Sequence, residues 1–148
     1  MVVFGLMAAR NSLMRGFIPA GFPMSAPTFF IIPVTDLFVF ATLIYFGWAL
    51  RTNGSTHKRL MIVATVSILD AAIARWPFAY IHNGHIGADL TCFSFLFLLM
   101  FYDLWSTHKI QRATLWASIF VIVVQEIRVP IGMTHLWLRF ADLVAGKV

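Results

Sequence analysis

Long apolar segments separated by short polar ones dominate the pattern of this chain. Four segments are long enough to span a hydrocarbon core about 30 Å thick, which takes roughly 20 helical residues. They run from about 29 to 50, 59 to 78, 86 to 105 and 113 to 137. Because polar residues collect between these segments instead of recurring along each one, the pattern favours lipid as the solvent. We predict an all-α membrane protein, a single domain over residues 1–148 with about four antiparallel transmembrane helices.

A shorter apolar segment, Met1 to Ala9, precedes the first predicted span. As a helix it covers only about 13 Å, less than half of a bilayer. No positively charged region precedes Val2, so the segment does not look like a signal peptide. It fits either a short interfacial or half-inserted helix, or the end of a spanning helix that begins upstream. Residues 10–28, which follow, contain three prolines and are predicted to form a loop at headgroup level instead of a helix.

Composition supports a membrane location. Of the 148 residues, 60% are hydrophobic and only 11% are charged, whereas soluble domains are about half apolar and about a quarter charged. The formal net charge of +5 comes from basic residues in short clusters between apolar segments. Positive-inside topology accounts for these clusters, so we expect no nucleic-acid partner. The single cysteine, Cys92, lies inside an apolar segment and is expected to be a small packing residue.

The Lys and Arg residues near the ends of the spans indicate the orientation. One short loop holds Arg51, Lys58 and Arg59, and the other holds Lys109 and Arg112. As many basic residues lie on the opposite side, but they are dispersed over a long loop and a tail. Because basic residues in short loops close to the membrane dominate orientation, we predict that both short loops face the cytoplasm.

Ionisable side chains at bilayer depth cost several kcal/mol unless they are paired or hydrated, so each marks a candidate site. Five fall within the predicted spans or near the end of one: Asp36, Asp70, Arg75, Glu126 and Arg128. Counting residues along antiparallel spans places the three acids some 10 to 16 Å below the same surface, with both arginines slightly nearer to it. Two interpretations stay open: an interhelical salt-bridge network that fixes helix register, or a site for a proton, an ion or a cofactor.

Within this group, Glu126 and Arg128 are two residues apart, which is about 200° around a helix, so they cannot pair with each other. Each needs a partner on a different neighbour, which places the fourth span between other helices or at a subunit interface. Pro130 removes the helical hydrogen bond to the carbonyl of Glu126. The freed carbonyl predicts either a simple bend or a site for water, a cation or an arginine.

Small residues recur along one side of the second span, at Ala64, Ser67, Ala71 and Ala74. Their spacings of three, four and three place them on one helix face, where they allow another helix to approach closely. Together with the bend at Pro130, this stripe gives the expected helix-packing positions.

All five histidines lie at or beyond the ends of the predicted spans. A bis-histidine haem needs imidazoles that project between helices inside the bilayer, so this pattern does not favour one. His82, His85 and His135 share one side of the membrane with Asp89, and three imidazoles with a carboxylate are a donor set that zinc accepts. Histidines at a membrane surface without a metal are the simpler interpretation, and no cofactor is strongly implied.

Several short stretches resemble a group of uncharacterised bacterial multi-pass inner-membrane proteins. They are HKRLM at 57–61, AT at 64–65, AAIARWP at 71–77, YDL at 102–104 and ATLW at 113–116, with Arg128. The resemblance covers about 100 residues and implies a multi-pass location in the bacterial inner membrane. This chain departs from the group in apparently lacking the start of an N-terminal helix with a basic His-Arg motif. It also has Gln111 and Arg112 where the group tends to show a His-Pro pair.

The sequence therefore predicts a small polytopic membrane protein that is an accessory or structural subunit of a membrane complex, or a homo-oligomer. Its expected partners are the lipid bilayer and other membrane subunits or further copies of itself. The alternative is a module that carries a proton, an ion or a cofactor such as haem or quinone at the acid and arginine cluster. No nucleophile constellation or phosphate-binding loop favours an enzyme.

Overall fold

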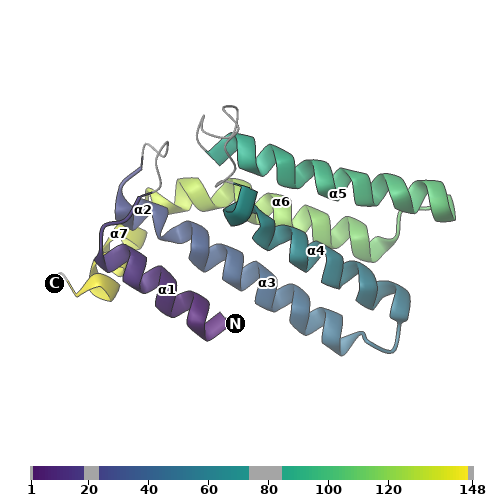
Figure 1. Cartoon of the computed structure of the whole chain (residues 1–148), viewed down its shortest axis with the longest axis horizontal. Helices are drawn as coiled ribbons and strands as arrows, with labels where there is room; N and C mark the ends of the chain where they lie inside the picture. The colour runs from purple at the N-terminus through teal and green to yellow at the C-terminus, as the bar shows by residue number, and fades with distance from the viewer. Residues whose placement is uncertain (1, 19–23, 74–84, 147–148) are drawn as a thin grey trace.

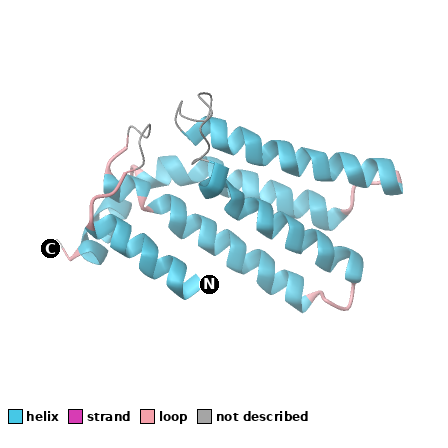
Figure 2. Cartoon of the chain, in the orientation of Figure 1, coloured by secondary structure: helices cyan, strands magenta, loops and turns pink. Residues whose placement is uncertain are grey.

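The computed structural model describes residues 2–18, 24–73 and 85–146, and every regular element in these ranges is a helix (Figures 1 and 2). The elements are α1 (Val2–Met14), α2 (Ala26–Phe29), α3 (Ile31–Ala49), α4 (Gly54–Ile73), α5 (His85–Thr107), α6 (Arg112–Gly132) and α7 (His135–Ala145). The predicted all-α class is confirmed for the described part of the chain. The four long helices, α3 to α6, lie side by side, and α2 and α7 gather at one end (Figure 1).

The long helices form an antiparallel bundle in which α3 contacts α4 and α6, and α4 and α6 both contact α5. The tight connections at 50–53 and 108–111 lie at the same end, which we call the short-loop end (Figure 1). At the opposite end, called here the α7 end, α3 and α5 begin and α6 finishes. Residues far apart in sequence therefore meet at each end.

Three helical segments are long and apolar enough to cross a membrane: Ala26–Ala49, Asp89–Ser106 and Arg112–Gly132. They correspond to the first, third and fourth predicted spans. The second predicted span falls on α4, whose first turns carry polar residues and whose described part ends at Ile73. Residues 74–78 of that predicted span lie outside the described residues, so a fourth span stays a prediction.

Helix caps move two predicted boundaries. Asn53 accepts a hydrogen bond from the Thr56 amide (3.2 Å), so α4 begins at Gly54 and takes in residues that we expected to be loop. Thr134 accepts one from the Trp137 amide (3.4 Å) and starts α7 at His135. The predicted fourth span to residue 137 was therefore too long, because the chain turns at 133–134.

Part of the predicted N-terminal loop is helical. The short apolar helix α1 continues to Met14, five residues beyond the predicted segment. Ser25 caps α2, with a proline in its first turn, where a fixed φ suits a helix start. Helix α1 runs antiparallel to α3 (Figure 1). Its Gly5 lies so close to α3 that a Cβ at this position would be 2.7 Å from a Leu37 methyl group.

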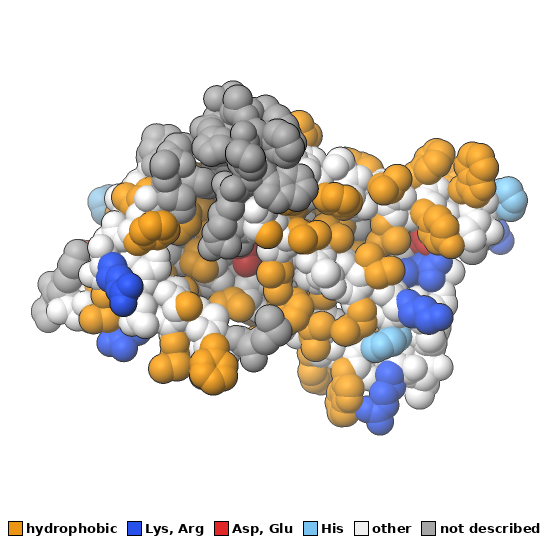
Figure 3. Space-filling model, viewed as in Figure 1, with side chains coloured by type: hydrophobic (Ala, Val, Ile, Leu, Met, Phe, Trp, Pro, Cys, Tyr) orange, Lys and Arg blue, Asp and Glu red, His pale blue; other side chains and the backbone are white. Residues whose placement is uncertain are grey.

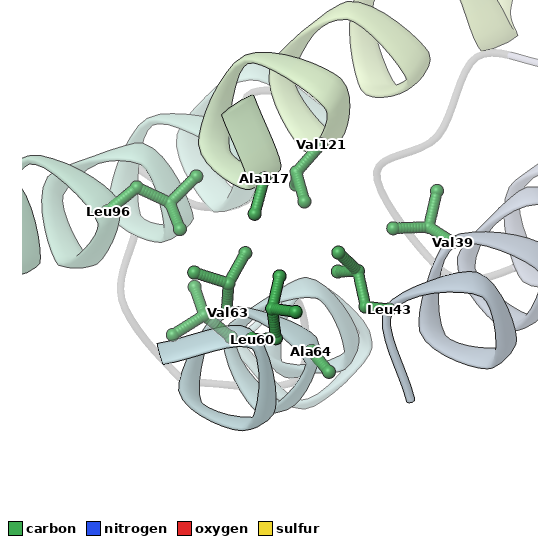
Figure 4. Packing of buried hydrophobic residues seen from close by; sticks show 9 residues of the cluster. Val39, Leu43, Leu60, Val63, Ala64, Leu96, Ala117 and Val121 are labelled. Carbon is green, nitrogen blue, oxygen red and sulfur yellow. The ribbon is translucent and has the colours of Figure 1, made fainter. Parts of the chain in front are cut away.

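The core draws apolar side chains from all four long helices (Figure 4). Nine buried residues form it: Val39, Leu43, Leu60, Val63, Ala64, Val66, Leu96, Ala117 and Val121. Ala64 and Ser67 of the predicted small-residue stripe are both buried, and the Ser67 hydroxyl donates to the Ala64 carbonyl (2.8 Å). Ala74 and the side chain of Ala71 lie outside the described residues. The described half of the stripe thus faces the bundle interior.

The surface of the bundle is apolar, while polar groups lie inside. On α5, large exposed side chains include Leu90, Phe97, Leu98, Phe101 and Trp105, of which Trp105 is 76% exposed. On the face drawn in Figure 3, hydrophobic side chains cover the middle and Lys and Arg gather toward the two ends. Asp103, Thr114 and Arg128 are meanwhile at most 1% exposed. This arrangement reverses that of a soluble bundle and suits a lipid solvent.

Candidate functional site

Three charged side chains from three helices meet near the α7 end, and we call them the Arg128 triad. The Arg128 Nη1 donates to Asp36 on α3 (2.8 Å), and its Nη2 donates to Asp89 on α5 (2.7 Å). Arg128 itself, on α6, is 1% exposed, and the side chains of Asp36 and Asp89 are 12% and 8% exposed. The planar fork of a guanidinium holds two separate carboxylates in fixed directions. The triad therefore joins α3, α5 and α6.

Helix periodicity brings these groups together. Asp36 and Asp89 each lie in the second turn of a helix that begins at the α7 end, and Arg128 lies in the last turns of a helix that finishes there. On α6, six of the seven buried positions follow spacings of four and three, with Ala117 beside them: Thr114, Ser118, Val121, Gln125, Arg128 and Gly132. Such spacing keeps one stripe directed at the neighbouring helices. Arg128 belongs to this buried stripe.

A second ionic cluster lies at the short-loop end. Arg59 on α4 donates to Asp103 on α5 through Nη2 (2.7 Å) and Nε (3.0 Å). The Thr114 hydroxyl on α6 donates to the other carboxylate oxygen (2.6 Å). Asp103 is fully buried, whereas the Arg59 side chain is 14% exposed. We call these three residues the Asp103 cluster.

Two polar side chains of the buried α6 stripe lie between the clusters. Ser118 is fully buried and Gln125 is 3% exposed. The Ser118 hydroxyl and both amide atoms of Gln125 make no hydrogen bond within the described structure. A buried polar group without a partner costs about 1–3 kcal/mol, so each is either a structural cost or a point where a small polar species binds.

The structure only partly assembles the predicted polar group. Asp36 and Arg128 meet as an ion pair. The side chain of Asp70 and the whole of Arg75 lie outside the described residues. Glu126 does not join the cluster, because Arg128 faces inward and a residue two positions away must then face outward. Its place beside Arg128 is taken by Asp89, which sequence analysis had assigned to a metal site.

Glu126 lies exposed on the outer face of α6. Its neighbours on that face include Ile119, Val123 and Ile127, which are 40%, 46% and 48% exposed. No ion pair or hydrogen bond joins the Glu126 carboxylate to another residue in the described ranges. It lies six residues, or about 9 Å, from the end of an apolar helix long enough to cross a membrane.

The structure does not assemble the predicted metal site within the described residues. Asp89 bonds to Arg128, and His135 is exposed at the start of α7. His82 and the side chain of His85 lie outside the described part of the chain. No three His, Cys, Asp or Glu side chains among those described are placed to hold a metal ion.

Pro130 also differs from its predicted packing role. It is exposed in the last turn of α6, and the residue that packs there is Gly132. A Cβ on Gly132 would lie 2.9 Å from an Ile31 methyl group and 3.2 Å from the Thr28 carbonyl oxygen. A glycine therefore lets α6 approach the start of α3, and sequence analysis missed this position.

The Asp103 cluster was missed as well, although a sequence signal exists. Asp103 follows Asp89 by 14 residues on α5, and Thr114 precedes Arg128 by 14 residues on α6. Fourteen residues make two heptads, so each pair returns to one helix face, about 21 Å apart. This interval is the signal in the sequence, but Arg112 and Glu126 repeat at the same interval on α6 and both are exposed, so the interval alone does not mark the buried face.

Comparison with protein-family models, with curated proteins and with solved structures found no match for this chain.

Proposed function

We propose that this protein is an accessory or structural subunit of a membrane complex, or a homo-oligomer, that associates through the outer face of α6. We place it in the bacterial inner membrane with the short-loop end in the cytoplasm. The proposal depends on one observation: an exposed carboxylate, Glu126, lies among exposed apolar residues of α6 without a partner in the described structure.

A charged side chain facing hydrocarbon costs several kcal/mol, and such residues pair with one another or with backbone groups. The Arg128 triad cannot supply this partner, because it lies on the opposite side of α6. A donor on a second membrane helix would satisfy the carboxylate, and the flanking Ile119 and Val123 would pack against the same helix.

The two ionic clusters support this role by making the bundle rigid. They tie each of the four long helices to at least one other through charged hydrogen bonds. A preorganised face loses less conformational entropy when it binds a partner.

The first test compares Glu126→Leu with the matched control Asp142→Asn, which removes an acid from α7, in lipid nanodiscs. We expect the wild-type protein and the Asp142 variant to assemble equally, and the Glu126 variant to dissociate at least about tenfold more readily, a loss of about 1.4 kcal/mol. Native mass spectrometry measures the assembly. A Glu126→Leu protein that assembles like wild type would refute the proposed face.

Cysteine crosslinking locates the contact for the homo-oligomer. Because Cys92 is buried, a single cysteine at Val123 would report on the α6 face, and one at Leu98, which is 62% exposed on α5, is the control. We expect disulfide-linked dimers from Val123→Cys alone. Equal crosslinking from both positions would contradict a specific α6 contact.

A second candidate function is proton or ion transfer along the buried α6 stripe, and the unpartnered Gln125 and Ser118 favour it. They lie on the buried α6 stripe between Thr114 of one cluster and Arg128 of the other, with Val121 between them. Under this alternative, Gln125→Leu abolishes proton flux in proteoliposomes while the fold survives. Under the structural role, the same substitution stabilises the protein, because it removes two unsatisfied buried atoms. Proton flux measured with a pH-sensitive dye, together with the unfolding temperature, distinguishes proton transfer from the structural role.

A further inference from the structure

A groove of about 390 Å³ opens between α3, α4 and α6 near the short-loop end. Leu43 and Phe46 of α3 form one wall, and Trp116 and Phe120 of α6 form the other. Phe46 and Trp116 are 50% and 67% exposed, so the groove opens sideways between the helices, toward the surroundings of the bundle. Its walls are almost entirely apolar.

Small side chains on α6 create this hollow. Ala113 and Ala117, one turn apart, line the groove where larger residues would fill it. The lining on α6 runs from Arg112 to Phe120, about 12 Å along the helix axis. The groove is therefore elongated along the bundle axis, the direction in which lipid chains lie in a bilayer.

A basic residue lies among the lining residues at the short-loop end of the groove. Arg112 lines it, is exposed, and makes no ion pair with any described side chain. Arg51, Lys58 and Lys109 lie in or beside the two connections at the same end. The nearest buried acid, Asp103, bonds to Arg59. The short-loop end of the groove therefore offers basic side chains to an anion, while the lining itself is suited to hydrocarbon.

We propose that this groove binds one acyl chain of an anionic phospholipid, with the lipid phosphate at Arg112. Basic pockets between membrane helices at the cytoplasmic side are a recognised setting for anionic headgroups. A helix segment of about 10 Å with a diameter of about 10 Å occupies roughly 800 Å³, so a partner helix could place only side chains in this groove. Arg112 shares a flank of α6 with Glu126 but lies 14 residues, about 21 Å, away from it along the helix, so the two sites are separated by depth.

The test combines native mass spectrometry of the detergent-purified protein with phosphatidylglycerol and, separately, phosphatidylcholine of the same chains. We expect the wild type to retain one phosphatidylglycerol at least threefold more than phosphatidylcholine. Arg112→Gln should remove this preference but still bind either lipid weakly, whereas Arg139→Gln, at the α7 end, should keep it. Equal retention of both lipids by the wild type, or an intact preference in Arg112→Gln, would overturn the site.

A second variant tests the chain-binding part. Ala113→Phe should fill the groove and lose the retained lipid, while Ala8→Phe on the exposed side of α1 should not. A circular dichroism melt that matches wild type shows that each variant is folded. If Ala113→Phe does not fold, the smaller substitution Ala113→Leu takes its place. One phosphatidylglycerol still held by a folded, filled variant would contradict the proposal. So would dihexanoyl phosphatidylglycerol binding as tightly as the long-chain lipid, because the headgroup alone would then explain binding.

Discussion

The two ionic clusters use the same chemistry in different surroundings. Both pair an arginine with an aspartate of α5, yet Arg128 is 1% exposed and divides its guanidinium between two helices, whereas Arg59 is 14% exposed and bonds one carboxylate. Arg59 also lies in the second turn of α4, close to the short-loop end. A guanidinium there can turn toward headgroups or water, and one in the triad cannot. The two clusters should therefore respond very differently when one partner is removed.

The largest effect is expected at Arg128. In Arg128→Met, Asp36 and Asp89 would remain as buried carboxylates without the guanidinium, which costs about 3–5 kcal/mol of unfolding free energy. Thermal or denaturant unfolding in mild detergent measures this loss. The triple variant Arg128→Met, Asp36→Asn and Asp89→Asn is the control and should recover part of the stability, because it removes the charges together. A single variant as stable as wild type would show that the triad holds no helices in place.

A smaller effect is expected at the other cluster. Asp103→Asn removes the charge that faces Arg59, but the partly exposed guanidinium can reach solvent, so we expect a loss of about 1–3 kcal/mol. The same unfolding measurement applies, with Asp142→Asn on α7 as a control for a lost acid. If Asp103→Asn destabilises the protein more than Arg128→Met does, the proposed difference between the exposed and the buried arginine is wrong.

The smallest effect concerns the hydroxyl that completes the Asp103 cluster. Thr114→Val keeps the shape of the side chain and removes a 2.6 Å hydrogen bond to a carboxylate, a loss of about 1–2 kcal/mol. A double-mutant cycle with Asp103→Asn isolates the coupling between the two side chains. If the two losses simply add, the hydroxyl contributes nothing through Asp103.

Sequence patterns could predict which residues share a depth, but not which way they face. Residue counting placed Asp36 and Arg128 in one layer, and they do meet. It placed Glu126 there too, because in lipid both the inner and the outer face of a helix are apolar and hydrophobic periodicity does not mark the inward side. Asp89 was grouped with the histidines near the membrane surface, but it lies in the second turn of α5 and bonds to Arg128 instead.

Other features depend on tertiary contacts that leave little trace in sequence. Gly132 permits the close approach of α3, but a glycine near a helix end looks like a stop signal. The groove at Arg112 exists because two alanines of α6 lie opposite large residues of α3, which requires the register between these helices. The helix caps at Asn53 and Thr134 are local signals and were readable from the chain.

The equal interval of 14 residues between the cluster residues on α5 and on α6 restricts how the bundle can move. A piston-like slide of one helix past the other by a turn, about 5.4 Å, would break the contacts at both ends in the same step. Tilting about the middle of the bundle, where Leu96, Ala117 and Val121 belong to the aliphatic core, strains each contact far less. Any working motion of this protein is therefore expected to be a rocking of helices, with both ends kept in register.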